Sequence, residues 1–300
     1  MGANRTVLVT GASGYVGRRL VSRLAERGTP VRALVHRSRS GLPEGVEAVE
    51  GDVTDAASLT RACEGAEVVV NLASITADRK PPAGGYDRVN AEGPAALGTA
   101  ARAAGVRRFV HLAGIDTSTG EPGPYLAGRR RGDAAVLASG VESTAILRPG
   151  IMFGGRDSAF VKALARLVKF SPAVPVPGDG TVRLQLIWVE DVVRCILQLA
   201  DDMRPGQFPI GGPDQPTYDE VLDTIGEGLG KRQVRKLHLP LPVFSVQARL
   251  LSVLPSPPLT PAALELFASD NITTPDAVEQ QFNFRPRGFA EHVRHEGLFA

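Results

Sequence analysis

The stretch VLVTGASGYVGRRL, residues 7–20, decides the fold. It opens with an apolar run typical of a buried strand and ends in an apolar pattern at helical spacing that continues to Leu24. A glycine motif, G-x-x-G-x-x-G, lies between the two patterns. When such a motif directly follows a strand and opens a helix, it predicts a loop that binds the phosphates of a dinucleotide.

Each glycine of this motif has its own physical role. Gly11 permits the tight turn off the strand, Gly14 lets the backbone approach a pyrophosphate, and Gly17 allows the helix to pack closely on the sheet. The helix N-terminus then offers N–H groups and the positive end of its dipole to the phosphates. The residues expected to bind the cofactor here are Thr10, Gly11, Ser13, Gly14, Tyr15, Val16 and Gly17.

The end of the second expected strand indicates which dinucleotide binds. An NAD site usually has Asp or Glu about 20 residues beyond the glycines, whereas this chain has His36, Arg37 and Arg39. Guanidinium groups suit the 2′-phosphate of NADP through charge-assisted hydrogen bonds, and Arg18 is placed to add another. NADP(H) is therefore favoured over NAD(H). The alternative is that these arginines are solvated surface residues.

The rest of the first half alternates short apolar runs with helical patterns. Strands are expected at residues 31–35, 46–49, 68–72, 109–112 and 144–147. Helices are expected from Asp55 to near Gly65 and at residues 86–104 and 124–139. This alternation predicts an α/β protein whose residues 1–150 form a Rossmann-type doubly wound parallel sheet.

The pattern changes after Pro149. A smaller mixed C-terminal lobe that binds the substrate is expected at residues 151–185 and 204–300. Between these two parts, a strand at 186–189 and a helix at 192–200 are expected to return to the main sheet. The apolar stretch 242–254 fits a lid, a partner surface or core, and core or pocket wall is favoured because packing requires hydrophobic residues.

Composition excludes several classes of function. The 34 Lys and Arg residues nearly balance the 32 Asp and Glu residues, so no strong positive field favours nucleic acid. The two cysteines, Cys63 and Cys195, are far apart, which disfavours a zinc site and fits a reducing cytoplasm. No apolar run is long enough to cross a bilayer. We expect a cytoplasmic protein that binds a small-molecule substrate and no metal, with a homo-oligomer or a protein partner left open.

Further motifs point to a known superfamily. They are Gly51-Asp52-Val53, Asn71-Leu72-Ala73, Val89-Asn90-Ala91-Glu92-Gly93, Tyr125-x-x-x-Arg129, Leu147-Arg148-Pro149-Gly150 and Trp188-Val189-Glu190-Asp191-Val192. With the glycine loop, they make the chain resemble the extended and atypical branches of the short-chain dehydrogenase/reductase superfamily, epimerase-like and NmrA-like. Residues 259–271 resemble the group that contains the nucleotide-binding accessory subunit of mitochondrial complex I and its bacterial relatives.

This resemblance implies further contacts to the cofactor. Asp52 and Val53 would flank the adenine, and residues 149–152 would meet the nicotinamide end. The remaining implied cofactor residues are Leu72, Ala73, Asn90, Pro149 and Ile151.

The chain departs from the catalytic pattern of the superfamily, which pairs Tyr-x-x-x-Lys with a Ser or Thr near the end of the fifth strand. Tyr125 and Arg129 are one helical turn apart, so the cation can lower the pKa of the phenol. A guanidinium, however, is wider than an ammonium and does not release its proton. No serine stands at residues 111–114, and Thr117 or Ser118 is the alternative hydroxyl. Tyr125 could instead be a packed aromatic side chain.

Other polar residues have structural interpretations. His36 and His111 lack an Asp or Cys at a suitable spacing in the sequence, so we interpret both as structural or cofactor-edge residues. The run of arginines at 129–131 could bind an anion, but a run of charges at the start of a helix is typical of a solvated face, which is the favoured interpretation.

Three functions remain open at this point. The favoured one is an NADPH-dependent oxidoreductase that acts on a small carbonyl or enone, with Tyr125 as acid and Arg129 as its support. The second is a protein that binds NADPH as a structural or sensing ligand, which the altered lysine and the missing serine favour. The third is an epimerase, dehydratase or cyclase without net redox change.

Overall fold

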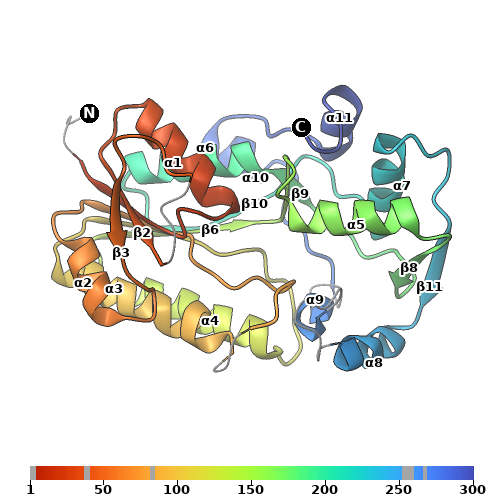
Figure 1. Cartoon of the computed structure of the whole chain (residues 1–300), viewed down its shortest axis with the longest axis horizontal. Helices are drawn as coiled ribbons and strands as arrows, with labels where there is room; N and C mark the ends of the chain where they lie inside the picture. The colour runs from red at the N-terminus through yellow and green to blue at the C-terminus, as the bar shows by residue number, and fades with distance from the viewer. Residues whose placement is uncertain (1–4, 37–40, 82–84, 252–259, 266–268) are drawn as a thin grey trace.

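The computed structural model describes residues 5–36, 41–81, 85–251, 260–265 and 269–300. Among these residues, seven strands form one parallel sheet in the order β10-β6-β5-β4-β1-β2-β3 (Figure 1). The strands are β1 (Val7–Thr10), β2 (Val31–Val35), β3 (Glu47–Glu50), β4 (Val68–Asn71), β5 (Arg108–Leu112), β6 (Ser143–Pro149) and β10 (Gly206–Ile210). The predicted Rossmann-type doubly wound fold is confirmed.

Helices cover both faces of the sheet, because successive strand residues point to opposite sides. Val7 and Val9 face the core shared with α1 (Tyr15–Glu26), α6 (Val189–Asp201) and α10 (Ala277–Phe282). Leu8, between them, faces the core shared with α2 (Ala56–Cys63), α3 (Gly93–Ala103) and α4 (Pro124–Leu137). The two layers of helices lie above and below the sheet in Figure 1.

Helix boundaries follow the local chemistry of the sequence. The Asp55 side chain accepts hydrogen bonds from the backbone N–H groups of Ala57 and Ser58, which caps α2 as expected. The helix predicted at 86–104 is present from Asp87 to Ala103, but its first part is π-helical. This π-helical turn, η1 (Arg88–Glu92), runs directly into α3. Pro94 lies at the start of α3, where its missing N–H cannot continue a hydrogen-bond ladder from the preceding turn.

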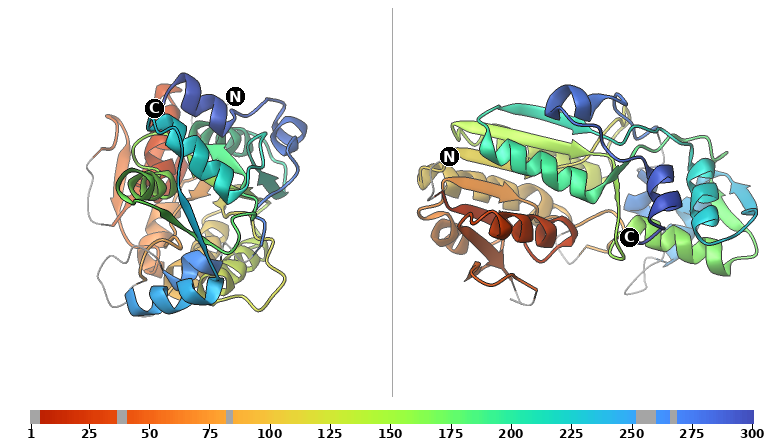
Figure 2. Two further views of the ribbon diagram at one scale, coloured as in Figure 1. Left: turned by 90° about the vertical axis from the view of Figure 1, so that its right-hand side faces the viewer. Right: turned by 90° about the horizontal axis from the view of Figure 1, so that it is seen from above.

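A smaller lobe lies at one end of the sheet (Figure 2). Its core joins α5 (Ala159–Phe170), α7 (Tyr218–Gly228) and α11 (Phe289–His295). Two short parallel sheets complete it: β7 (Ile151–Phe153) with β9 (Leu186–Trp188), and β8 (Val174–Pro177) with β11 (Lys236–Leu239). The chain continues from β11 into α8 (Leu241–Leu251), and α9 (Pro261–Glu265) follows and contacts α4.

Two strands differ from the prediction. A strand at 186–189 was expected to join the main sheet, but it pairs with β7 instead. The helix that follows it, α6, does pack on the main sheet. The main sheet gains β10, which pairs with β6 and lies within the part expected to belong to the smaller lobe. Gly206 and Pro209 weaken the strand signal of β10, and an edge strand tolerates such a proline because its N–H is not needed.

The apolar stretch 242–254 was expected to be core or pocket wall, and only part of it is buried. Phe244 and Ala248 of α8 are buried, whereas Val243 and Val246 are exposed. Residues 252–254 lie outside the described residues. Within the described part of the chain, no helix is both long and apolar enough to cross a membrane. No group of three or more His, Cys, Asp or Glu side chains there is arranged to hold a metal ion.

The strand order determines where a ligand can bind. Strands β2 and β3 lie on one side of β1, and β4, β5 and β6 lie on the other, so the order reverses between β1 and β4. Connecting segments diverge at such a point and leave a crevice at the carboxyl ends of the strands. Thr10 and Asn71 end β1 and β4 as register partners there, which marks the place of the candidate site.

Candidate cofactor site and active site

The glycine loop has the geometry that the motif predicts. Gly11 has a φ of +66°, which favours glycine, and a Cβ there would lie 2.8 Å from the backbone nitrogen of Ala73. A Cβ at Gly17 would lie 2.1 Å from the carbonyl oxygen of Gly11. The N–H of Gly14 donates to that same oxygen at 2.9 Å. The turn from β1 into α1 therefore has no room for side chains at Gly11 or Gly17.

The N-terminus of α1 is open to an anion. Gly14 is the N-cap, and it has no side chain that could cap the first turn of α1. Backbone N–H groups at such a terminus, with the positive end of the helix dipole, favour a phosphate. Because the loop lacks Cβ atoms where the chain is most crowded, its backbone can approach a pyrophosphate closely. The residues present therefore fit a dinucleotide.

Tyr15 and Arg18 join the first turns of α1 to the segment after β7. The hydroxyl of Tyr15 donates to the carbonyl oxygen of Gly154 at 2.7 Å, and burial raises the pKa of Tyr15. The guanidinium of Arg18 pairs with the carboxylate of Asp157 at 2.6 Å, and both side chains are about half exposed. An exposed pair of this kind contributes at most about 1 kcal/mol, so Arg18 remains free to exchange partners.

At the end of the site expected to bind the adenine, the structure joins two of the expected cofactor residues. His36 Nδ1 lies 2.8 Å from Asp52 Oδ2. Partial burial works to raise the pKa of Asp52, but hydrogen bonds from Thr54 and the nearby His36 outweigh it and lower that pKa. Val53 follows Asp52 and is partly buried. Arg37 and Arg39 lie outside the described residues, so the expected guanidinium site stays a prediction.

The segment after β4 is held by Thr10 and Asn90. The hydroxyl oxygen of Thr10 accepts from the N–H of Ala73 at 3.4 Å, and the N–H of Leu72 donates to the Thr10 carbonyl at 3.3 Å. The Asn90 amide both accepts from the N–H of Ile75 and donates to the Ile75 carbonyl, each at 2.8 Å. These contacts make Asn90 a brace for this segment.

Residues 149–152 cross from the main sheet into the smaller lobe. The N–H of Ile115 donates to the Pro149 carbonyl at 3.0 Å, and the N–H of Ile151 donates to the Gln185 carbonyl at 3.0 Å. Ile151 and Met152 are partly exposed. Their position beyond β6, at the carboxyl edge of the sheet, is compatible with the contact that the family resemblance implies.

Tyr125 lies in an apolar environment at the start of α4. Its ring is 5% exposed and meets the ring of Tyr86 edge-on, with 5.2 Å between centroids. Leu126 and Ala262 of α9 belong to the same cluster. The Nη1 atom of Arg129 donates to the Tyr125 hydroxyl at 3.0 Å. The side chain is therefore packed as the alternative interpretation expected, and its hydroxyl also contacts a cation as the catalytic interpretation requires.

The guanidinium of Arg129 also lies beside Gly114, the last residue of the stretch that lacks the expected serine. A Cβ at Gly114 would lie 2.8 Å from Arg129 Nη2 and 2.9 Å from Nη1. A lysine at position 129 would end in a smaller group, whereas the planar guanidinium fills this space. The two departures from the superfamily pattern therefore lie side by side in the structure.

The hydroxyls proposed as substitutes for the serine are engaged elsewhere. Thr117 hydrogen-bonds to the carbonyl of Asp270, and Ser118 donates to Asp116 Oδ1 at 2.9 Å. Arg130 binds both Asp116 and Ser118. Within the described part of the chain, neither hydroxyl has a hydrogen bond to Tyr125 or Arg129.

The solvated face predicted at 129–131 is present only in part, since the side chains of Arg130 and Arg131 are 40% and 58% exposed. Arg129 turns inward to Tyr125, Arg130 binds Asp116, and Arg131 pairs with Asp87. Helical geometry separates consecutive side chains by about 100°, so adjacent arginines reach different partners.

A buried polar network crosses the carboxyl ends of β1, β4 and β5. Thr10 donates to Asn71 Oδ1 at 2.6 Å, and Asn71 Nδ2 lies 3.0 Å from His111 Nδ1. His111 Nε2 lies 3.2 Å from Asp133 Oδ1 on α4. Since the Asn71 amide donates to Nδ1, the ring proton is on Nε2 and is donated to Asp133. The network therefore ends at a carboxylate one helical turn beyond Arg129.

Asp133 is the junction of this network. Arg148 of β6 binds its second oxygen at 2.6 Å. Burial works to raise the pKa of Asp133, but the hydrogen bond from His111 and the charges of Arg148 and Arg129 hold that pKa below its ordinary value. Asn71, His111 and Asp133 are less than 10% exposed. A small cavity lies against this network and is lined by Ala73, Ser74, Asn90, His111, Arg129 and Asp133, among others.

The premise that His36 and His111 lack partners was wrong, since each lies beside an aspartate. The sequence carried no local signal for either pair, because Asp52 and Asp133 come from other elements. Asp133 shares a helix face with Tyr125 and Arg129, at intervals of four residues, and that spacing was the available clue.

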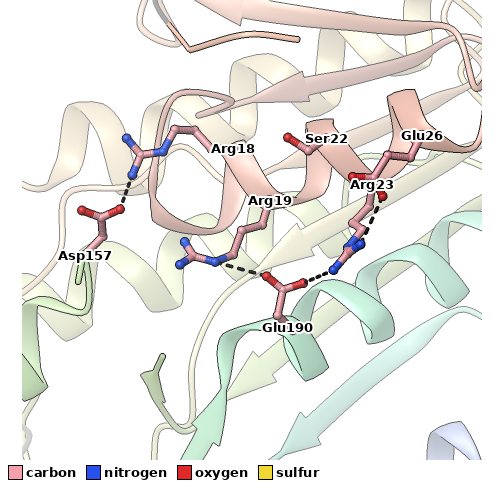
Figure 3. Close-up of a pocket in the computed structure, with 7 residues that line it drawn as sticks. All are labelled: Arg18, Arg19, Ser22, Arg23, Glu26, Asp157 and Glu190. Atoms are coloured by element: carbon pink, nitrogen blue, oxygen red, sulfur yellow. Dashed lines mark hydrogen bonds and ion pairs between the residues drawn. The ribbon is translucent and has the colours of Figure 1, made fainter. Parts of the chain in front are cut away.

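A groove of about 450 Å³ on the outer face of α1 lies apart from Tyr125 and its neighbours. Figure 3 shows Arg19 and Arg23 of α1 reaching the same carboxylate, Glu190, each at 3.3 Å. Arg18 reaches Asp157 beside them. Because its arginines are paired and its lining is charged, the groove lacks the apolar wall typical of a substrate pocket. The ion pairs that line the groove join α1 to the start of α6.

The parallel sheet, the glycine loop and the Tyr125–Arg129 pair define a protein of the short-chain dehydrogenase/reductase class. More narrowly, the model of the NAD dependent epimerase/dehydratase family matches residues 7–211, and the chain belongs to that family. The resemblance predicted from the sequence is confirmed.

Individual relatives extend this assignment. A ceramide reductase of Caulobacter vibrioides is 31% identical over 88% of this chain and 83% of its own length. The mitochondrial subunit 9 of the NADH dehydrogenase (ubiquinone) 1 alpha subcomplex from Arabidopsis thaliana is 26% identical over 89% of this chain and 69% of its own length. The similarity to the complex I subunit group is thus confirmed.

Solved structures agree in fold. A UDP-glucose 4-epimerase of Thermus thermophilus, in complex with NAD, superposes with a TM-score of 0.73 at 22% identity. The match covers 98% of this chain and 97% of that one. Family membership, together with the name of the reductase relative, supports the expected NAD(P)-dependent enzyme of the oxidoreductase type.

Proposed function

We propose that this protein reduces the carbonyl group of a small ketone or enone with NADP(H), and that Tyr125 is the proton donor. The observation that carries the proposal is the hydrogen bond of 3.0 Å between Arg129 Nη1 and the Tyr125 hydroxyl. Both residues lie near the start of α4, which follows β5 and so begins at the carboxyl edge of the sheet. That edge is where this fold binds its ligands.

The bound cofactor would supply a hydride to the carbonyl carbon. In this step Tyr125 gives its proton to the carbonyl oxygen, and Arg129 stabilises the negative charge that the phenolate gains. Arg129 does not replace the lost proton, because a guanidinium stays protonated. The proton therefore returns from solvent, and Arg129 acts only through its charge and position.

The surroundings of Tyr125 favour a substrate with an apolar part. Tyr86, Leu126 and Ala262 pack around the ring, and Ile75 adjoins the same cluster. The relative with 31% identity is named for ceramide, which is a lipid. We therefore expect the small ketone or enone to carry an apolar part.

Turnover tests the assignment of Tyr125. Replacing Tyr125 with Phe should lower kcat by roughly 100- to 10,000-fold, since the proton donor is lost. NADPH binding, measured by the change in its fluorescence, should persist. The substrates are a panel of ketones and enones with increasing chain length, and NADPH oxidation is the readout.

Tyr86→Phe is the matched control. It removes a hydroxyl from the adjacent ring, where that hydroxyl donates to the Arg79 carbonyl at 3.1 Å, and should leave kcat nearly unchanged. Equal kcat values for Tyr125→Phe and the wild type would overturn the role of Tyr125. Product formed without a net change in NADPH would instead support an epimerase, dehydratase or cyclase.

The preference for NADP(H) rests on Arg37 and Arg39 after β2. Replacing both with Ser should weaken NADPH binding by roughly 10- to 100-fold, because charge-assisted hydrogen bonds to the 2′-phosphate are lost. NADH binding should not change. Arg27→Ser, at the opposite end of α1, is the control. Equal affinities of the wild-type protein for NADPH and NADH would contradict the preference.

A second candidate is a protein that binds NADPH without turning it over. The observation that favours it is the guanidinium of Arg129 in the space where a side chain at position 114 would lie. The similarity to the complex I subunit adds support, since such a protein would use its surface to meet a partner. Cofactor that co-purifies and is not oxidised by any carbonyl of the panel would favour this candidate over the reductase.

A further inference from the structure

One end of the smaller lobe exposes an unusual share of apolar side chains. Nine large hydrophobic side chains are exposed in the described part of the chain, and six of them come from α5, β11 and α8. Phe170, at the end of α5, is 74% exposed. We call this set the apolar end; it consists of Leu167, Phe170, Leu237, Leu241, Val243 and Val246.

The same segments carry positive charge and no negative charge. Residues 158–178 and 228–264 contain no Asp or Glu, although the whole chain has 32. The same two segments include four of the five lysines of the chain. Their basic residues are Lys162, Arg166, Lys169, Lys231, Arg232, Arg235, Lys236 and Arg249. A chain that is nearly neutral overall is therefore locally basic here.

Most of these cations face solvent without an acidic partner. Lys162, Arg166, Lys169, Arg232 and Arg235 are exposed, and among the described residues none of them forms an ion pair. Lys236 differs, because it pairs with Asp223 of α7 at 2.7 Å. Lys236 is therefore not a free cation. Asp219 lies beside His238 and Lys236, so these two side chains already have an acidic neighbour.

The charged and apolar side chains come from segments that adjoin. The Lys231 ammonium donates to the carbonyl of Val168 near the end of α5, and the N–H of Val174 donates to the Arg235 carbonyl at 2.8 Å. Strand β11 then leads directly into α8. The left view of Figure 2 shows the end of α5, β11 and α8 on the side that faces the viewer.

We propose that this end of the molecule binds the surface of an anionic lipid bilayer. Exposed Phe and Leu side chains enter the boundary between headgroups and acyl chains, while Lys and Arg bind the anionic headgroups through long side chains. Stable binding requires both kinds of contact. A few apolar side chains alone give weak adsorption, and a few charges alone are screened by salt. The proposal is independent of the proposed reductase activity.

Sedimentation with vesicles tests the proposal. The full chain should pellet with vesicles of phosphatidylcholine and phosphatidylglycerol, and not with phosphatidylcholine alone. Raising the salt from about 0.1 M to about 0.5 M should weaken the binding, since the charge term is screened. No binding to the anionic vesicles, or equal binding to both kinds, would overturn the proposal.

Two variants separate the charged from the apolar contribution. Arg166→Gln with Lys169→Gln should weaken binding by roughly 30-fold, since each cation near an anionic surface contributes about 1 kcal/mol. Phe170→Ser should weaken it by roughly tenfold through lost apolar burial. Circular dichroism verifies that each variant is folded, as expected for exposed side chains.

Matched controls come from the opposite part of the molecule. Arg61→Gln on α2 removes an exposed cation, and Leu137→Ser at the end of α4 removes an apolar side chain that is 44% exposed. Neither should change vesicle binding. Variants at α5 that bind as tightly as these controls would show that another surface is responsible and overturn the proposal.

Discussion

The glycine loop and the surroundings of Tyr125 differ in what determines them. At the loop, the backbone itself is the constraint, since a Cβ at Gly17 would lie 2.1 Å from the Gly11 carbonyl. Around Tyr125, side chains determine the geometry, since Tyr86 and Leu126 pack on its ring and Arg129 binds its hydroxyl. Local sterics require a fixed motif, whereas a side-chain arrangement admits compensating substitutions. The comparison therefore predicts different responses to mutation in the two regions.

The largest effect on stability is expected at the junction of the buried network. Asp133→Asn should lower the free energy of unfolding by about 3 kcal/mol, because Arg148 and His111 lose their buried acidic partner. Urea denaturation measures it. Glu47→Gln, which breaks the exposed pair with Arg32, is the control and should cost at most about 1 kcal/mol. Equal losses in the two variants would refute the importance of the network.

The same carboxylate should produce a dependence of stability on acid. The pKa of Asp133 is lower in the folded protein than its ordinary value, so the ionised carboxylate stabilises the fold above about pH 4. That contribution is lost as the pH falls through the lowered pKa. Denaturation curves recorded at decreasing pH should therefore converge for the wild type and Asp133→Asn. A constant gap between them down to low pH would contradict this assignment.

The next effect tests the rigidity of the glycine loop. Gly17→Ala should weaken NADPH binding by roughly 10- to 100-fold and destabilise the fold by about 1–3 kcal/mol, because the added methyl overlaps the backbone. Gly120→Ala is the matched control, since a Cβ there meets no atom within 4 Å. Calorimetric titration with NADPH measures the affinity. If the Gly17→Ala variant kept the affinity and stability of the wild type, the backbone of the loop would be able to move away from the added methyl group.

A smaller effect is expected from the coupling of positions 114 and 129. Gly114→Ser alone should displace the Arg129 guanidinium and reduce stability, whereas the same change beside Arg129→Lys should be better tolerated. We expect a coupling energy of about 1 kcal/mol in a double-mutant cycle of unfolding free energies. Strict additivity would show that the two departures from the superfamily pattern are unrelated. If the reductase proposal holds, the double variant should also keep measurable turnover.

The smallest effect is expected at the exposed pair of Arg18 and Asp157. Asp157→Asn should change the free energy of unfolding by less than about 1 kcal/mol, because both side chains are about half exposed. Thermal unfolding at low and high salt measures the difference, which should vanish at high salt. A loss as large as that of Asp133→Asn would mean that the segment after β7 depends on this pair.

The parts of the fold that the sequence predicted well are those with strong local patterns. Strand β2 lies at the predicted residues 31–35, and Asp55 caps α2 as expected. Strand β10 was missed, because Pro209 and Gly206 give it no strand pattern and its partner β6 lies far away in the sequence. Pairing between distant segments carries no periodic signal.

The same distinction applies to the candidate site. The glycine loop and the spacing of Tyr125 and Arg129 were predicted from the sequence and are present in the structure. The partner of His111 was not predicted, since Asp133 reaches it from a different element, the helix that follows β5. The sequence also did not predict that the Arg129 guanidinium lies beside Gly114, because the direction of an arginine side chain depends on tertiary packing.

Gly114 and Arg129 bear on how catalytic activity is inferred from sequence motifs in this superfamily. A pattern search treats an absent serine and an exchanged lysine as two independent losses, and multiplies the odds against catalysis accordingly. In this chain the guanidinium lies where a side chain at position 114 would begin, so the two departures meet at one place in the structure. A low motif score alone is therefore weak grounds for classing the protein as inactive.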